Sequence, residues 1–346
     1  MSIRFDPKLS SLAQNLTGHP SPSIEPVKGG GNNRFYKITT DRQQFGLKFY
    51  LQTPDDPRDR QQTESTALTF LNARAFPQVV KLHKENRDNH CSLMEWIEGS
   101  PPAVPYSSTD VDQVLRFVEA LYQAGTTPQA QAIPLASASC LSGFDLEIQL
   151  YKRLERLKSH LPDHPELAQF IQAEFTPFLK KQVVESQRGY QSHQLDFFHP
   201  IPLTQRILSP SDFGFHNSIR RLDGRLVFLD FEYFGWDDPC KMTCDFLLHP
   251  GMNIAAQDQE INSSLQSELT GGIVDICRID PTLSVRIEQL YPLYGLCWCL
   301  IILNEFLPQS WTRRERANPE PRDQLKTQDQ QLKKARRLLL TLRKTG

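Results

Sequence analysis

Three polar residues in the second half of the chain have the types and spacing of a cation site. Asp212 precedes Asn217 by five positions, and Asp230 follows at the end of the strand-like run 225–230. Carboxylate and amide oxygens are hard ligands that suit magnesium, an ion that also keeps waters and takes phosphate oxygens. We therefore expect Asn217 and Asp230 to hold Mg2+, with Asp212 just outside the pair.

A predicted hairpin would bring the two metal ligands together. The Asp-Gly pair at 223–224 is a favoured two-residue hairpin turn. If Leu222 opposes Arg225, the register carries Asn217 opposite Asp230, with Cβ atoms about 5 Å apart. The alternative is a surface hairpin in which Asn217 and Asp230 only cap the ends. That alternative leaves the five-residue spacing before Asn217 unexplained.

A pair of opposite charges is predicted in the first hundred residues. The apolar residues of the strand-like run 45–50 alternate onto one face, which leaves Lys48 on the other. On the predicted helix 60–73, Glu64 falls on the apolar stripe, where an acid needs a cationic partner. A strand lysine paired with a helix glutamate is the arrangement that holds nucleotide phosphates in kinases. A lysine that simply faces solvent is the alternative.

A glycine loop precedes this pair. Gly29, Gly30 and Gly31 lie between the strand-like runs 24–27 and 35–39. Glycines let the backbone approach phosphate oxygens closely and offer N–H groups to them. The loop lacks the spaced G-x-G-x-x-G pattern, so plain turn chemistry is the alternative. The charge pair that follows favours binding of nucleotide phosphates.

A change of pattern near residue 98 indicates two lobes. The stretch 24–97 is mostly strand-like, whereas helical periodicity dominates from Thr109 onward. A glycine and two prolines at 99–102 discourage any regular continuation between them. We predict an α+β fold with a small antiparallel sheet in residues 1–98 and a larger, mostly helical part in residues 99–346. Helices are expected, among others, at 60–73, 145–160, 166–186 and 324–344.

The overall composition argues against several classes of protein. The 346 residues include 39 Lys and Arg and 40 Asp and Glu, so no global field favours nucleic acid or an anionic membrane. The first residues lack the apolar run of a secretory signal, and the longest apolar stretch, 295–303, is too short to span a bilayer. Seven cysteines in a chain of this size indicate reduced thiols. We expect a cytoplasmic protein, and the oligomeric state stays open.

Taken together, these motifs resemble those of the aminoglycoside phosphotransferase family of small-molecule kinases, which includes choline- and ethanolamine-kinase relatives. The resemblance covers most of the chain and rests on the glycine loop at 29–33, Lys48, Glu64, the connector at 94–97, the loop at 209–217 and the segment 230–239. The run Asp-Phe-Glu-Tyr at 230–233 is especially similar to the choline-kinase branch. The resemblance implies a two-lobed, protein-kinase-like fold, ATP and Mg2+ as cofactors, and transfer of the γ-phosphoryl group to a hydroxyl of a small molecule.

The resemblance also implies roles for single residues. Asp212 becomes the catalytic aspartate, and Lys48 becomes the phosphate anchor. The backbone of Glu95 and Ile97, in the connector after a buried strand, would hold adenine. The metal pair described above becomes the pair of magnesium ligands. Asp212 and the metal ligand five residues later also match the D-x-x-x-x-N spacing of a kinase catalytic loop.

One departure from the family pattern concerns the catalytic loop. The family has His-Gly directly before the catalytic aspartate, whereas Pro210 and Ser211 precede Asp212 here. Because that histidine mainly braces the loop, its replacement affects the expected loop geometry more than the chemistry. His216 is a candidate substitute, and a solvent-facing or structural histidine is the alternative.

The phosphoryl acceptor is poorly specified by the sequence. Acids and aromatic residues follow the metal loop, namely Glu232, Asp237, Asp238, Asp245, Tyr233, Trp236 and Trp298. They suit a cationic amino sugar or amino alcohol through charge pairing and cation–π contact. A neutral sugar is the rival acceptor, because Asp238 could simply cap a helix and Trp298 could lie in the core. A nucleotide-binding pseudokinase with a regulatory role is the alternative from another class, and the retained Asp212 argues against it.

Overall fold

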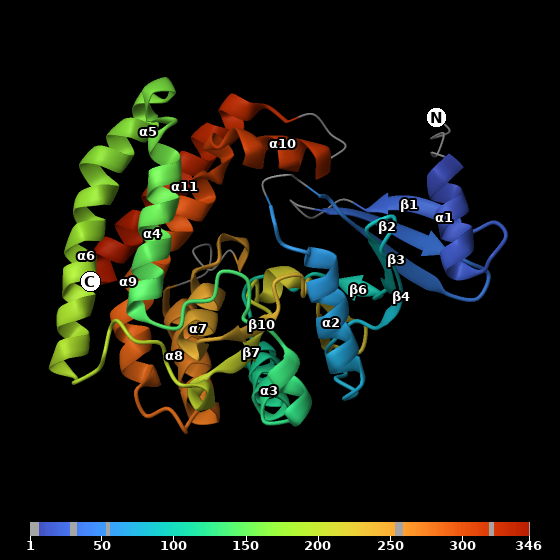
Figure 1. Cartoon of the computed structure of the whole chain (residues 1–346), viewed down its shortest axis with the longest axis horizontal. Helices are drawn as coiled ribbons and strands as arrows, with labels where there is room; N and C mark the ends of the chain where they lie inside the picture. Colours follow the sequence, from blue (N-terminus) through green and yellow to red (C-terminus); the bar gives the residue numbers. More distant parts are fainter. Residues whose placement is uncertain (1–6, 28–32, 53–55, 253–258, 318–321, 346) are drawn as a thin grey trace. The chain divides into compact units, whose positions relative to one another are not determined.

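The computed structural model describes residues 7–27, 33–52, 56–252, 259–317 and 322–345, whose elements are labelled in Figure 1. These residues form two compact units. The first unit comprises the described parts of Met1–Ser100, Ile219–Glu232 and Thr312–Arg322, and the second those of Pro101–Ser218, Tyr233–Trp311 and Asp323–Gly346. The predicted boundary after Glu98 lies close to the first break, but the sequence pattern does not predict the two later segments of the first unit.

The first unit is built on a five-stranded antiparallel sheet with the order β1-β2-β3-β5-β4. Its strands are β1 (Ser23–Val27), β2 (Asn33–Thr39), β3 (Gln44–Tyr50), β4 (Leu82–Asn86) and β5 (Cys91–Glu95). The other elements are α1 (Pro7–Thr17), α2 (Arg60–Asn72) and a small sheet of β6 (Gly99–Ser100), β8 (Ser218–Arg221) and β9 (Leu226–Phe228). The sheet and α2 confirm the strand-rich region with one helical interruption that the sequence predicts.

The two faces of β3 have different partners. Phe45 and Leu47 pack in a core cluster with Leu12 and Leu16 of α1, which lies along this sheet (Figure 1). Successive strand residues point to opposite faces. Lys48 therefore points to the other face, as predicted, where its ammonium meets the side chains of α2.

The second unit is mostly helical. Its long helices are α3 (Ser108–Gly125), α4 (Gly143–Lys158), α6 (Thr176–Ser192), α7 (Pro239–Leu248), α8 (Gln259–Ile276), α9 (Leu283–Ile302) and α11 (Gln324–Thr345). The short α5 (Pro165–Gln169) continues through a π-helical stretch at Phe170–Phe175 into α6, and α10 (Pro308–Ala317) crosses from this unit into the first. A two-stranded sheet joins β7 (Ile207–Ser209) to β10 (Gly235–Asp237), and short helical turns include Phe215–Asn217 and Pro250–Met252.

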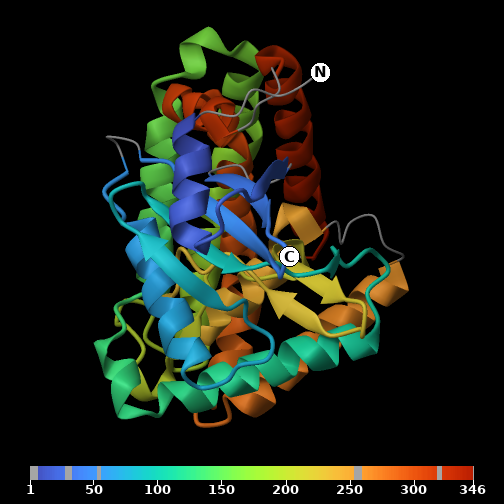
Figure 2. The ribbon, with the colours of Figure 1, turned by 90° about the vertical axis from the view of Figure 1, so that its right-hand side faces the viewer.

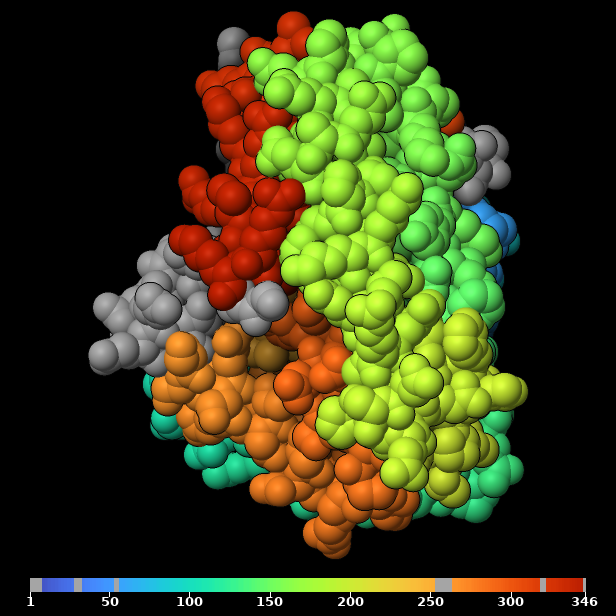
Figure 3. All heavy atoms as spheres, turned by 90° about the vertical axis from the view of Figure 1, so that its left-hand side faces the viewer, coloured from blue at the N-terminus to red at the C-terminus, as the bar shows by residue number. Residues whose placement is uncertain are grey.

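The core of the second unit is centred on α9, whose side chains are buried along most of its length. Helices α4, α6, α7 and α11 pack around it. Figure 2 shows α3 running beside α8, and Figure 3 shows α6 beside α11. Arg343 of α11 donates to the carbonyl of Glu174 just before α6, so part of the basic face of this helix serves packing.

No single helix in the described part of the chain is long and apolar enough to cross a membrane. Helix α9 with the turn that follows it and α10 meet the length and composition only as a pair, which is bent by 75°. All seven cysteines are buried and free of disulfide bonds. The cysteines therefore agree with the reduced thiols that the sequence predicts.

Candidate active site

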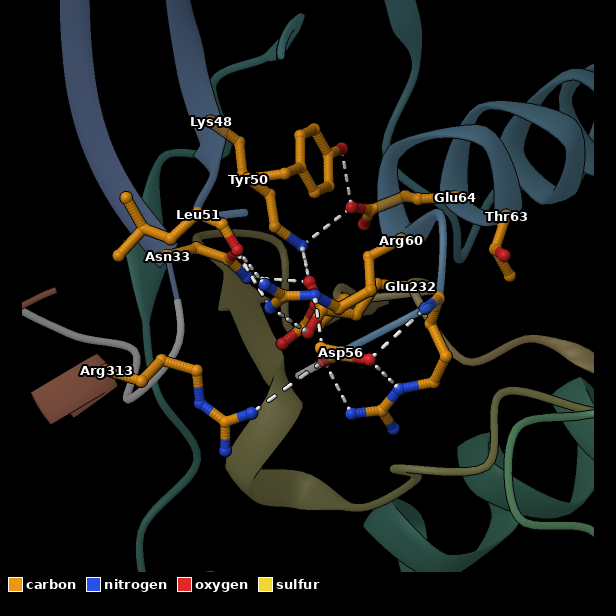
Figure 4. A network of polar contacts seen from close by, with 12 residues as sticks. Asn33, Lys48, Tyr50, Leu51, Asp56, Arg60, Thr63, Glu64, Glu232 and Arg313 are labelled. Carbon is orange, nitrogen blue, oxygen red and sulfur yellow. Dashed lines mark hydrogen bonds and ion pairs between the residues drawn. The ribbon is translucent and has the colours of Figure 1, made fainter. Parts of the chain in front are cut away.

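The predicted pair of Lys48 and Glu64 forms within the first unit. The Nζ of Lys48 lies 2.6 Å from Oε2 of Glu64, and both side chains are buried (Figure 4). The same carboxylate accepts the Tyr50 hydroxyl at 2.7 Å and the backbone N–H of Phe231 at 3.0 Å. Each oxygen of Glu64 thus has a donor, which compensates the cost of burying the charge. The pair is confirmed, and the phosphate-anchor role of Lys48 stays a prediction.

Two further carboxylates meet Lys48 in this unit. Its Nζ lies 2.6 Å from Asp230 and 3.4 Å from Glu232. Oxygens of Glu64, Asp230 and Glu232 lie within 4.8 Å of one another, so the cluster could accept a metal cation. Burial disfavours the charged ammonium, but the three acids outweigh it and raise the pKa of Lys48. Burial, assisted by Glu232 and Glu64, also raises the pKa of Asp230, and Lys48 opposes that shift.

A buried arginine completes this network, and the sequence analysis missed it. Arg60 donates to Glu232 Oε1 and Asn33 Oδ1, both at 3.3 Å, and to the carbonyl of Leu51 (Figure 4). Asn33, just after the glycine loop, in turn donates to Glu232 Oε2 at 2.6 Å. Arg60 lies one helical turn before Glu64, and that spacing was the available signal. The three glycines, Gly29, Gly30 and Gly31, lie outside the described residues.

The connector residues lie at the edge of the five-stranded sheet. Glu95 ends β5, its N–H donates to the carbonyl of Lys81, and its carboxylate pairs with Arg221 at 2.6 Å. Ile97 is buried and lies outside any strand, and within the described residues its N–H makes no hydrogen bond. An unpaired amide at such a position needs a partner. This geometry agrees with the predicted role of the connector backbone toward adenine, which stays a prediction.

The predicted hairpin register is wrong. The N–H of Arg221 donates to the carbonyl of Arg225, and the N–H of Gly224 donates to the carbonyl of Arg221. The turn therefore has three residues, Leu222 to Gly224, with Gly224 at φ 85°. A type I turn followed by a glycine bulge uses the same Asp-Gly pair as a two-residue turn, so the dipeptide alone does not determine the length of the turn. The shift removes the register argument that Asn217 lies opposite Asp230.

Both predicted metal ligands nevertheless present an oxygen. Asn217 donates from its Nδ2 to the backbone carbonyl of Asp212 at 2.9 Å, which leaves its Oδ1 to a cation. Oδ1 of Asp230 accepts a hydrogen bond from Lys48. The backbone of Asp230 lies at φ 66°, a left-handed conformation that aspartate tolerates better than most residues. Asn217 belongs to the second unit and Asp230 to the first. Their shared magnesium stays a prediction.

The predicted catalytic aspartate is held by histidines of the second unit. Oδ1 of Asp212 lies 3.0 Å from Nε2 of His216 and 3.4 Å from Nε2 of His249. Burial disfavours the carboxylate, but the hydrogen bond from His216 and the nearby imidazole of His249 outweigh it and lower the pKa of Asp212 to about 2. Ser211, at φ 69°, turns the loop just before it. Asp212 is therefore ionised at neutral pH, as a proton acceptor must be.

The acids that suggested a cationic acceptor already have partners. Asp237 and Asp245 pair with Lys241, and Asp238 pairs with Arg286. Glu232 pairs with the cations of the first unit, as described above. Trp236 is buried with its N–H on a backbone carbonyl, whereas Trp298 is partly exposed. These carboxylates therefore give no preference for a cationic over a neutral acceptor.

A family model described as the phosphotransferase enzyme family matches residues 23–246. Comparison with curated protein sequences gives no significant match. Solved structures with a similar fold include the choline kinase LicA from Streptococcus pneumoniae, at 15% identity and a TM-score of 0.56, covering 97% of this chain and 100% of that chain. Spectinomycin phosphotransferase APH(9)-Ia, solved with ADP and spectinomycin, has 11% identity and a TM-score of 0.63, with 97% and 98% covered.

An ethanolamine kinase from Plasmodium vivax is also similar, at 13% identity and a TM-score of 0.58, with 94% of this chain and 83% of that chain covered. At such low identity these likenesses bear on the fold alone, and they confirm the predicted α+β, protein-kinase-like architecture. The family model spans more than half of the 346 residues and includes the strand lysine, the helix glutamate and the loop around Asp212. The chain belongs to the phosphotransferase enzyme family.

Proposed function

We propose that the protein is an ATP- and Mg2+-dependent kinase that transfers the γ-phosphoryl group to a hydroxyl of a small molecule. The observation that carries this proposal is the buried lysine cluster of the first unit. Lys48 has the strand position and the helix glutamate that kinases use to hold the nucleotide phosphates. The family membership supports the same reaction class.

Each residue would contribute a separate part of the reaction. Magnesium, held by Asn217 and Asp230, would neutralise charge that develops on the phosphates. Lys48 would bind phosphate oxygens, and the backbone of the connector would orient adenine. Asp212 would accept the proton of the acceptor hydroxyl as the new oxygen–phosphorus bond forms and ADP leaves.

The acceptor is proposed only as a class, namely an amino sugar, a neutral sugar or an amino alcohol. Two of the similar structures are a choline kinase and an ethanolamine kinase, and a third holds spectinomycin. The test is a panel of these three classes, scored for ATP-dependent formation of the phosphorylated product. A cytoplasmic location stays a prediction alongside it.

The control variant for the panel is Asp212→Asn, which keeps the shape of the side chain but removes the proton acceptor. Its turnover should fall by about 10²-fold or more, with ATP affinity little changed. Near wild-type turnover in this variant would contradict the catalytic role of Asp212. If MgATP stabilises the wild-type protein against heat but neither an acceptor nor water is phosphorylated, the pseudokinase alternative is correct instead.

A further inference from the structure

Two histidines, one within the loop at 209–217 and one from beyond it, meet the predicted catalytic aspartate, and the loop lacks the histidine expected before that aspartate. His216 lies four residues after Asp212, and His249 follows α7, 37 residues away. Nε2 of His216 is hydrogen-bonded to Oδ1, and Nε2 of His249 lies 3.4 Å from the same oxygen. Both histidine contacts are therefore made with Oδ1.

The hydrogen-bond partners of the rings determine where their hydrogens lie. The N–H of Gly251 donates to Nδ1 of His249 at 3.0 Å, so a neutral His249 carries its hydrogen on Nε2. Burial, assisted by the neighbouring His216, lowers the pKa of His249 to about 4, which keeps the ring neutral at pH 7. Nδ1 of His216 is buried and has no hydrogen-bond partner within the described residues. A neutral His216 therefore gains a hydrogen bond only by donating from Nε2 to Asp212.

Packing fixes both rings in this orientation. They stack with centroids 3.6 Å apart and planes inclined by 7°. Trp298 packs edge-on against His249 at 4.5 Å and is itself held by a hydrogen bond to Asp245. On the other side, a Cβ at Gly214 would lie 2.6 Å from Nδ1 of His216, so only glycine leaves room for the ring.

The same three side chains could in principle hold a metal, because their ligand atoms lie within 4.8 Å of one another. The tautomer of His249 argues against it, because the hydrogen bond from Gly251 to Nδ1 places the ring hydrogen on Nε2 and leaves no lone pair there for a metal.

We propose that the stacked pair of His216 and His249 positions Asp212 through Oδ1, so that Oδ2 is the oxygen that accepts the proton of the phosphoryl acceptor. The pair would thereby replace the loop histidine whose place Pro210 occupies. This inference rests on the proposed kinase function and deepens it. Both histidines are positioning residues, since they act through Asp212.

The first experiment is made at His249, because a change at His216 would disturb its neighbour Asn217. The amide of His249→Gln can replace the Nε2–H donor, whereas His249→Phe keeps the ring without a donor. Hydrolysis of MgATP with water as acceptor is followed by ADP release. We expect kcat to fall on the order of 10- to 100-fold in His249→Phe, to recover largely in His249→Gln, and KM for ATP to stay constant.

The matched control is His199→Phe. His199 also pairs with a carboxylate, at 2.6 Å from Asp196, but its side chain is 81% exposed. The His199→Phe variant should hydrolyse ATP at the wild-type rate. An equal loss of kcat in His249→Gln and His249→Phe would reduce His249 to a packing residue and overturn the inference. If Asp212→Asn loses activity while His249→Phe does not, the positioning role fails and the kinase function stands.

A second measurement does not depend on ATP hydrolysis or on the folding of the His249→Phe variant. Long-range 1H–15N NMR of the imidazole nitrogens should show His249 in the Nε2–H tautomer at neutral pH. Asp212→Asn should shift the Nε2 resonances of both His216 and His249, and leave those of His199 in place. An Nδ1–H tautomer at His249, or resonances that ignore Asp212, would overturn the inference even if the wild-type protein hydrolyses no ATP.

Discussion

Each unit buries a cation between carboxylates, and the two clusters differ in how completely their oxygens are satisfied. In the second unit, Arg286 pairs with Asp238 and Asp280. The other oxygen of Asp238 accepts the N–H of Cys240 at the start of α7, and the other oxygen of Asp280 accepts the N–H and hydroxyl of Thr282. Both acids have side chains only 2% exposed, so this cluster is closed.

The cluster of the first unit is open at one member. Glu64 has a donor on each oxygen, as the acids around Arg286 do. Asp230 instead has 31% of its side chain exposed, and within the described residues its second oxygen accepts no hydrogen bond. A closed ionic cluster mainly fixes structure, whereas an open one leaves a carboxylate for a ligand. The comparison therefore favours a structural role for Arg286, and ligand binding by Lys48 and Asp230 stays a prediction.

The largest expected effect is on nucleotide binding in Asp230→Asn. The variant removes the open carboxylate from a site crowded with acids, so it should abolish Mg2+-dependent ATP binding and leave the protein as stable as before, or more stable. Calorimetric titration with ATP, with and without Mg2+, and thermal unfolding test both parts. Asp280→Asn is the matched control and should show the reverse, with lower stability and intact binding. Unchanged Mg2+ dependence in Asp230→Asn would contradict the assignment.

The next largest effect is on stability in Arg286→Met. Removing the cation leaves two buried acids unpaired, which should cost about 3–5 kcal/mol of unfolding free energy. Urea unfolding measures this cost, and the ATP hydrolysis rate per folded molecule should not change. Lys48→Met is the counterpart in the open cluster and should lose hydrolysis as well. Lower ATP hydrolysis in Arg286→Met with unchanged stability would contradict the structural role of Arg286.

A smaller effect is expected for Glu64→Gln. The amide keeps the shape but removes the charge that holds Lys48, and a hydrogen bond to a charged group contributes roughly 1.5 kcal/mol, or about tenfold in kcat/KM for ATP. Glu98→Gln is the control, because Glu98 also pairs with a strand lysine, Lys37, but 62% of its side chain is exposed. That variant should behave as wild type. Equal effects in the two variants would mean that burial does not distinguish the pairs.

The smallest expected effect is a pH dependence in the second unit. Burial raises the pKa of Asp237 to about 7, because Lys241 lies nearer to Asp245, at 2.6 Å, than to Asp237, at 3.4 Å. A carboxyl whose pKa is higher in the folded state stabilises the protein at pH below its unfolded value near 4, and this contribution is lost as the pH rises through about 7. Urea unfolding between pH 4 and 8 should show this decline in the wild type and less of it in Asp237→Asn. An identical slope in both proteins would contradict the shift.

Periodicity within single elements predicts part of the active site. The alternation of β3 sets Lys48 apart from Phe45 and Leu47, and the helical stripe of α2 carries Glu64. Both patterns are local, because the backbone geometry of a strand or helix fixes which residues share a face. A buried acid and a buried base that follow one another in the chain then suggest their own pairing, and the 2.6 Å contact confirms it.

Turn chemistry shows where local signals stop. The Asp-Gly pair at 223–224 marks a hairpin, which the structure contains. The pair is compatible with two turn geometries that differ by one residue in register, and a shift of one residue moves every side chain on the strand to the other face. The choice lies with the packing of both strands, which no dipeptide encodes.

The sequence by itself determined the fold class, the strand lysine with its helix glutamate, and the loop that carries Asp212, since each depends on residues close together in the chain. Only the tertiary structure decided which charges meet across long separations. Asp230 joins Lys48 from 182 residues away, and His249 reaches Asp212 from beyond a helix. Such contacts depend on how whole elements pack, because a side chain's partner across the core is set by the positions of both backbones rather than by its own neighbours in sequence.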